Sequence, residues 1–124
     1  MNEYRLEPIY DHQKSFYGKA KVREIMGIKI LTSYETDVAA ITPDGAIHRL
    51  WQGQYIEKNY GMYGTYEEWQ EWTATTGKHI REFAKQNGQF NFGKKEYLKL
   101  EVEELSELIK YAALRNERTK TEIA

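Results

Sequence analysis

Residues 16–23 read FYGKAKVR, and their alternation predicts the sheet on which the fold is built. The face that includes Phe16 and Val22 is apolar or small, whereas positions 19, 21 and 23 on the opposite face are basic. Successive side chains of an extended strand point to opposite sides, so a period of two predicts one buried face and one wet face. This strand needs a partner and a cover.

The flanking sequence supplies further strands. Short runs rich in β-branched and aromatic residues are separated by turn signals, which is typical of an antiparallel meander. Pro43 and Gly45 suit the second position and the positive-φ position of a turn, so the strands on either side of them should form a hairpin. The predicted strands are Phe16–Ile25, Ile28–Ile41 and Ala46–Trp51, with turns at Met26-Gly27 and residues 42–45.

Two helices are expected to cover the sheet. The first begins near Thr75 or Thr76, whose hydroxyl would cap it, and ends at Asn87-Gly88. Its apolar stripe comprises Thr76, Ile80, Phe83 and Ala84. The second runs from about Val102 to Asn116, with acidic residues in its first turn and basic residues in its last, as the helix dipole favours.

The predicted fold class is therefore α+β, with a small antiparallel sheet of about three strands covered by two helices and an aromatic insertion before the first main helix. A chain of 124 residues has the length of one domain. We expect residues 1–14 to form an N-terminal arm or short strand, residues 15–117 to form the single domain, and residues 118–124 to form a frayed tail.

Composition excludes several classes of function. A net charge of -1 removes the broad attraction on which non-specific nucleic-acid binding depends, and it also disfavours mimicry of DNA. The absence of cysteine excludes disulfides and thiolate chemistry and fits a reducing cytosol. No apolar run approaches the length of a membrane span, so a cytoplasmic location is expected.

The most unusual stretch is an aromatic run between Trp51 and Thr73. Its glycines disfavour a helix and its irregularity disfavours a strand, so an ordered loop is predicted, followed by a short helix from Thr65 to Trp72. Such rings can be core, a protein-binding face or a stacking platform for bases, and the residues alone leave all three open. The candidate partner-binding residues are Tyr55, Tyr60, Tyr63, Tyr66, Trp69 and Trp72.

A second motif, TATTGKH at residues 73–79, combines hydroxyls, glycine and lysine at a predicted helix start. Helix capping explains these residues, and an anion contact by Thr75, Thr76 and Lys78 is the alternative. The spacing does not match a phosphate-binding loop. His79 is interpreted as a partly buried histidine bonded to a backbone carbonyl rather than as a general base. No catalytic residue, metal ligand or cofactor is predicted.

Three blocks of this sequence resemble a family of short uncharacterised proteins from bacteriophages and mobile elements of Gram-positive bacteria. The blocks are FYGKAKV at residues 16–22, SYETDVA at residues 33–39 and TTGKHIREF at residues 75–83. They match the patterns FYGKAKV, SYxTxVA and TTxxHIxEF, and the resemblance covers roughly residues 15–88. It implies an origin and a fold more than a chemistry. The chain departs from the compact pattern by lengthening the aromatic stretch.

The leading hypothesis is a non-enzymatic, phage-type accessory protein in the host cytoplasm. It would bind and inhibit a bacterial host protein or nucleoprotein complex, as an anti-CRISPR or other anti-defence inhibitor does, because an aromatic loop on a rigid scaffold suits that role. The alternative is a small nucleic-acid-binding module that uses aromatic stacking and the helix start near Thr75. The oligomeric state is left open.

Overall fold

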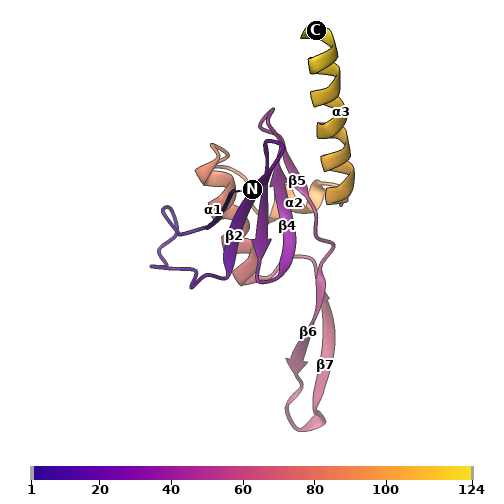
Figure 1. The fold of residues 1–124 in the computed structure, drawn as a ribbon. Helices are drawn as coiled ribbons and strands as arrows, with labels where there is room; N and C mark the ends of the chain where they lie inside the picture. The colour runs from indigo at the N-terminus through magenta and orange to yellow at the C-terminus, as the bar shows by residue number, and fades with distance from the viewer. Residues whose placement is uncertain (1, 124) are drawn as a thin grey trace.

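The computed structural model describes residues 2–123, with side chains described for residues 2–115. A five-stranded antiparallel sheet forms the body, and a separate two-stranded hairpin projects from it (Figure 1). In chain order the elements are β1 Asn2–Arg5, β2 Ala20–Ile25, β3 Ile28–Ser33, β4 Thr36–Ile41, β5 Ile47–Arg49, β6 Gln54–Asn59, the 3-10 turn Gly61–Tyr63, β7 Thr65–Gln70, α1 Ala74–Gln86, α2 Lys94–Lys99 and α3 Leu105–Ile123.

The predicted three-strand sheet covered by two helices is wrong, although the fold is still mixed α and β. The range Ile28–Ile41 holds two strands, because the chain reverses at Tyr34, which adopts φ 59°. An L-residue rarely takes positive φ, so nothing in the local sequence signals this turn. The N-terminal segment also pairs with β2 as strand β1, and α2 adds a short third helix.

The sheet is a simple meander whose order, β1-β2-β3-β4-β5, follows the chain. Met26 and Gly27 both have positive φ, at 53° and 82°, and they join β2 to β3 in the predicted two-residue turn. Positive φ at both central residues matches the right-handed twist of the strands that the turn connects. The turn at residues 42–45 likewise joins β4 to β5, as predicted.

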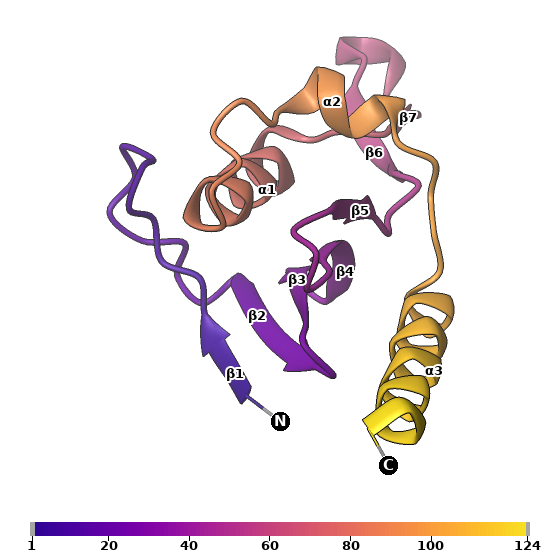
Figure 2. The same cartoon turned by 90° about the horizontal axis from the view of Figure 1, so that it is seen from above.

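Helices lie on both faces of the sheet, α1 on one and α3 on the other (Figure 2). Alternation along β3 divides the two layers, because Leu31 points toward α1 while Ile28 and Ile30 point toward α3. The core beneath α1 is the larger and contains most of the buried aromatic rings. The first turns of α3 close the smaller core through Leu105, Leu108, Ile109 and Ala112.

Helix α1 confirms its predicted stripe, since Thr76, Ile80, Phe83 and Ala84 are all buried. The helix begins earlier than predicted, at Ala74. Thr73 is the N-cap, and its hydroxyl accepts a 3.3 Å hydrogen bond from the backbone N–H of Thr76. The helix ends at Asn87, with Gly88 at φ 85°, as the sequence predicted.

Two local predictions for the aromatic run are corrected. The segment expected to be an ordered loop and then a helix from Thr65 to Trp72 is a hairpin of β6 and β7. Cross-strand pairing from Gln54–Gln70 to Asn59–Thr65 satisfies the backbone N–H and C=O groups that a loop would leave to water.

Helix α3 extends to Ile123. The predicted frayed tail, residues 118–124, falls where side chains lie outside the described residues, so it stays a prediction.

Among residues 2–123, no helix has both the length and the apolar character that crossing a membrane requires.

Gly77 gives a test of how tightly α1 packs against the chain before it. Alanine is normally favoured over glycine inside a helix by about 1 kcal/mol. At Gly77, however, an added Cβ would lie 2.5 Å from the buried indole of Trp72. We therefore expect Gly77→Ala to lower the free energy of unfolding by roughly 1–3 kcal/mol in urea titrations. Combining it with Trp72→Leu should remove most of the additional loss, and a stabilising Gly77→Ala in the native background would contradict this packing.

Candidate functional site

The β6–β7 hairpin brings together five of the six residues predicted to bind a partner. Strand pairing places Tyr55 directly opposite Trp69, and their ring centroids are 5.0 Å apart in an edge-to-face arrangement. At the far end, Tyr60 lies 5.7 Å from Tyr63 and 5.6 Å from Tyr66. These aromatic pairs run along a ribbon that points away from the body (Figure 1).

The tip is a tight structure and holds its rings at defined positions. The backbone N–H of Tyr60 donates to Gly64 O at 2.7 Å, and the N–H of Gly61 donates to the side chain of Asn59 at 2.8 Å. Gly64 has φ 94°, which only glycine adopts easily. The turn therefore presents Met62 and Tyr63 outward from a backbone whose polar groups are satisfied locally.

A buried arginine anchors the base of the hairpin. The Arg49 guanidinium donates to the carbonyl oxygens of Trp51 and Gln52, at 2.9 Å and 3.3 Å, and lies 3.4 Å from a carboxylate oxygen of Glu71. It also lies over the ring of the buried Tyr97, 5.0 Å from the centroid. One side chain thus contacts both chain segments that lead into the hairpin, so it fixes where the ribbon leaves the body.

Trp72, the sixth predicted partner-binding residue, lies in the core and not on a surface. Its side chain is buried, its ring centroid is 5.5 Å from that of Tyr97, and Arg81 lies over its indole ring. Trp51, at the other foot of the hairpin, is buried in the same core. The tryptophans that frame the aromatic run are therefore its anchors, and only Trp69 stands out in solvent.

The three residues predicted to contact an anion differ in their exposure to solvent. Thr75 and Lys78 are exposed at the start of α1, whereas Thr76 is buried and its Oγ1 lies 3.1 Å from Ser33 Oγ. Thr76 also gives its backbone N–H to the cap residue Thr73. The structure thus uses this threonine for capping and for a contact with the sheet, and the anion contact stays a prediction.

His79 is buried, as expected, but its partner is a hydroxyl and not a backbone carbonyl. Its Nδ1 lies 2.7 Å from Ser33 Oγ, and its ring packs edge-to-face on Phe16. Burial lowers the pKa of His79 from 6.5 to about 4, against an upward pull from Asp11. The imidazole is therefore neutral near pH 7 and ties the end of β3 to α1.

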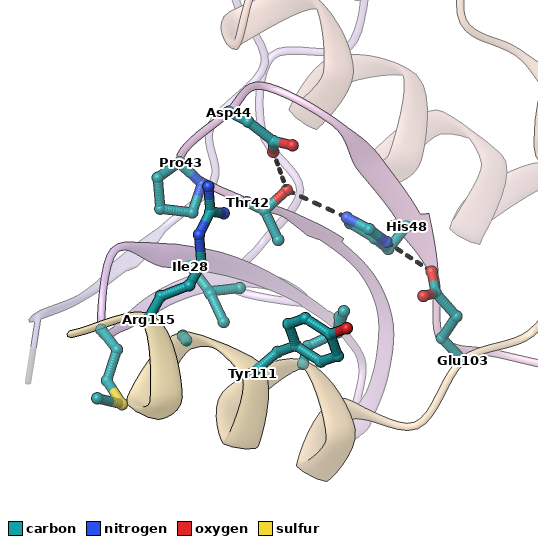
Figure 3. Close-up of a pocket in the computed structure, with 11 residues that line it drawn as sticks. Ile28, Thr42, Pro43, Asp44, His48, Glu103, Tyr111 and Arg115 are labelled. Carbon is teal, nitrogen blue, oxygen red and sulfur yellow. Dashed lines mark hydrogen bonds and ion pairs between the residues drawn. The ribbon is translucent and has the colours of Figure 1, made fainter. Parts of the chain in front are cut away.

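A cleft of about 610 Å³ between the β4–β5 turn and α3 was not predicted (Figure 3). His48 lies in it, with Nε2 3.1 Å from Thr42 Oγ1 and Nδ1 2.5 Å from a carboxylate oxygen of Glu103, while the Thr42 hydroxyl donates to Asp44. The opposite wall includes Leu108, Tyr111 and Arg115 of α3. Its residues come from three separate segments, so no single stretch of sequence signals it.

The polar groups of this cleft bond to one another. Their structural role is to hold the β4–β5 turn against the segment that leads into α3. No group of three or more metal-binding side chains occurs in the part of the chain that the structure describes.

Comparison with protein families identifies the family of the chain. A model of a family of unknown function, DUF8033, matches residues 4–99. The chain belongs to this DUF8033 family. The match begins within β1 and includes β2 to β7, α1 and α2, so the projecting hairpin is inside the family region and α3 follows it. No curated protein and no solved structure matches the chain significantly.

The buried histidine makes the stability of this DUF8033 protein depend on pH. The pKa of His79 is about 4 in the folded state, whereas in the unfolded chain it has its ordinary value of 6.5. As the pH falls, the unfolded state therefore takes up a proton before the folded state does. Stability should therefore be lost progressively from pH 6.5 to pH 4, and this one group should cost roughly 2–3 kcal/mol between pH 7 and pH 4.5.

His79→Asn keeps a polar atom near Nδ1 and cannot titrate. Urea unfolding at the two pH values should show a smaller loss in this variant than in the native chain, by about the amount above. His12→Asn, at an exposed position, serves as the control. Equal pH dependence in the native chain and His79→Asn would show that His79 is not held neutral by the fold.

Proposed function

We propose that the protein is a non-enzymatic binding protein that engages its partner through the β6–β7 hairpin. The observation that carries the proposal is the exposure of the hairpin's large side chains: Met62 is 92% exposed, Tyr63 80%, and Tyr55 65%. Folding gains little from aromatic groups left in water, and clusters of this kind mark interaction sites. Tyrosine and tryptophan combine a large rigid area with a polar group, which suits a protein interface.

The anchored base supports the same proposal. Arg49 and the two buried tryptophans, Trp51 and Trp72, hold the feet of the ribbon, so the aromatic groups are presented at defined positions before binding. A preorganised surface loses less conformational entropy when a partner binds. A projecting ribbon can also enter a groove that a flat surface cannot reach.

For the biological role we propose a phage-type or mobile-element accessory protein that binds and inhibits a bacterial host protein. Anti-defence inhibition, including the inhibition of CRISPR nucleases, is the class to test first. The support is the resemblance of the blocks at residues 16–22, 33–39 and 75–83 to phage-encoded proteins, together with the aromatic hairpin. We expect the protein to work in the cytoplasm of the host.

The nucleic-acid alternative has weaker support, because the hairpin is acidic. Residues 54–70 contain three glutamates and one lysine, giving the ribbon a net charge of −2. Stacking platforms for bases are normally combined with a basic groove that follows the phosphates. Lys78 and Arg81 on α1 are exposed, but they lie on the body and not on the ribbon.

Changing Tyr60, Tyr63 and Tyr66 together to alanine tests the main proposal. We expect the triple variant to fold and to lose at least about thirtyfold in affinity for a host partner, the effect of removing one interfacial hot spot. The measurement is affinity capture from lysate of a Gram-positive host, followed by a binding titration and an inhibition assay on the captured protein.

A control variant removes two exposed tyrosines from the body, Tyr17→Ala with Tyr111→Ala. The native chain and this control should capture and inhibit the same protein. A partner that the triple variant captures equally well, or the absence of any partner whose capture depends on the hairpin, would contradict the proposal.

A fluorescence titration with a 20-nucleotide thymidine strand at low salt tests the alternative. The acidic hairpin predicts no saturable change in the tryptophan emission of the chain, to which the exposed Trp69 contributes. Binding that weakens steeply with added salt would instead favour the nucleic-acid role.

A further inference from the structure

The two faces of the hairpin differ in a way that identifies the chemistry of its partner. The pairing register places Tyr55 and Trp69 on the same face as Glu57 and Glu67, one step farther along each strand. Lys58, the ribbon's lysine, belongs to the opposite face, where it pairs with Tyr66. One face therefore combines an aromatic pair with two carboxylates and no cation.

Glu57 lies directly opposite Glu67 across the ladder. Like charges at such positions repel and destabilise a strand pair. Both side chains are exposed, and no ion pair to either one occurs within residues 2–115. On this face the two flanking pairs, Tyr55–Trp69 and Asn59–Thr65, are uncharged, so within the described residues no cation on the same face offsets the repulsion.

Two rings beside two carboxylates form a surface that suits a guanidinium or ammonium group. A cation stacks on the face of tryptophan or tyrosine and pairs with a carboxylate at the same time, and arginine does both best. A cation in this position would also remove the repulsion between Glu57 and Glu67. A phosphate backbone would be repelled by the same carboxylates.

Building on the proposed function, we propose that this face, formed by Tyr55, Glu57, Glu67 and Trp69, docks on an arginine- or lysine-rich protein surface. The net charge of the ribbon is −2 whereas that of the whole chain is −1, so the acidity is concentrated on the projecting element. Opposite charges on the two sides of an interface guide the encounter and select the partner.

The experiment is an NMR titration of the full chain with a hexa-arginine peptide, which stands in for the basic surface, read on the three tryptophan indole N–H signals. The Trp69 signal should shift saturably, while the signals of the buried Trp51 and Trp72 should stay unchanged and report that the fold is intact. A hexa-glutamate peptide should produce no shift.

The variant Glu57→Gln with Glu67→Gln keeps the shape of the face and removes its charge. It should weaken hexa-arginine binding at least fivefold and leave the thermal midpoint equal or higher, because the repulsion disappears together with the site. The matched control, Glu101→Gln with Glu104→Gln, makes the same change in net charge at exposed positions on the body and should bind within twofold of the native chain.

Three results would overturn the inference: native affinity in the hairpin variant, an equal loss in the control, or a larger Trp69 shift with a thymidine strand than with hexa-arginine. Failure of the proposed function gives a different pattern. If host inhibition needs Tyr60, Tyr63 and Tyr66 but is unaffected by Glu57→Gln with Glu67→Gln, the binding role stands and the basic partner is rejected. If hexa-arginine binds as expected and no host protein depends on the hairpin, the host-inhibitor role is the part that fails.

Discussion

The buried guanidinium of Arg49 joins more parts of this protein than any other interaction described above. It bonds to the carbonyl oxygens of Trp51 and Gln52 at the first foot of the hairpin and contacts Glu71 at the second. It also lies 3.4 Å from Leu100 O at the end of α2 and stacks on Tyr97. A buried charge is tolerated only when its donors are satisfied, so these carbonyls and the arginine need one another. The direction of the hairpin follows from that requirement.

A second junction brings together the three sequence blocks at residues 16–22, 33–39 and 75–83. Phe16 of the first block, Ser33 of the second, and Thr76 and His79 of the third meet in one buried cluster. Half-exposed Tyr34 lies at the edge of this cluster, where its backbone N–H donates to Lys19 O at 2.6 Å and its ring centroid is 6.0 Å from that of His79. Residues of these three blocks thus form the contact between β3 and α1. Their role in this arrangement is to join sheet and helix. Gln54 and Ile56 at the start of the hairpin line the same pocket as Ser33 and Thr76, so the hairpin leaves the body beside this junction.

Features that depend on residues close together in the sequence could be predicted, whereas features that depend on contacts between distant residues could not. The alternation from Ala20 to Ile25 in β2 and the stripe of α1 are local patterns that burial imposes directly, so both are confirmed. The first part of the predicted strand, residues 16–19, is instead a turn in which Tyr17 and Gly18 have positive φ. The turn at Tyr34 escaped prediction because contacts with Lys19 and His79 hold it, and those residues are distant in sequence. The hairpin escaped because neither of its faces is buried in a core, so its strands carry no alternation of apolar and polar residues. The aromatic residues of the candidate surface could be named in advance, whereas the burial of Trp72 and the pairing of Glu57 with Glu67 required the register.

The separation of anchors from contacts gives the hairpin its particular energetics. Trp51 and Trp72 contribute to stability through burial, and Arg49 fixes their spacing, so the base belongs to the folding core. Only glycine fits at position 53, because a Cβ there would lie 2.5 Å from Gln70 O. Beyond Gly53, the ribbon adds exposed rings and unpaired carboxylates that contribute little to folding. An isolated two-stranded hairpin is marginally stable in water, so this one depends on its anchored base. Substitutions along the exposed ribbon can therefore change what it binds while leaving the body intact, and this separation is what a recognition element on a stable domain requires.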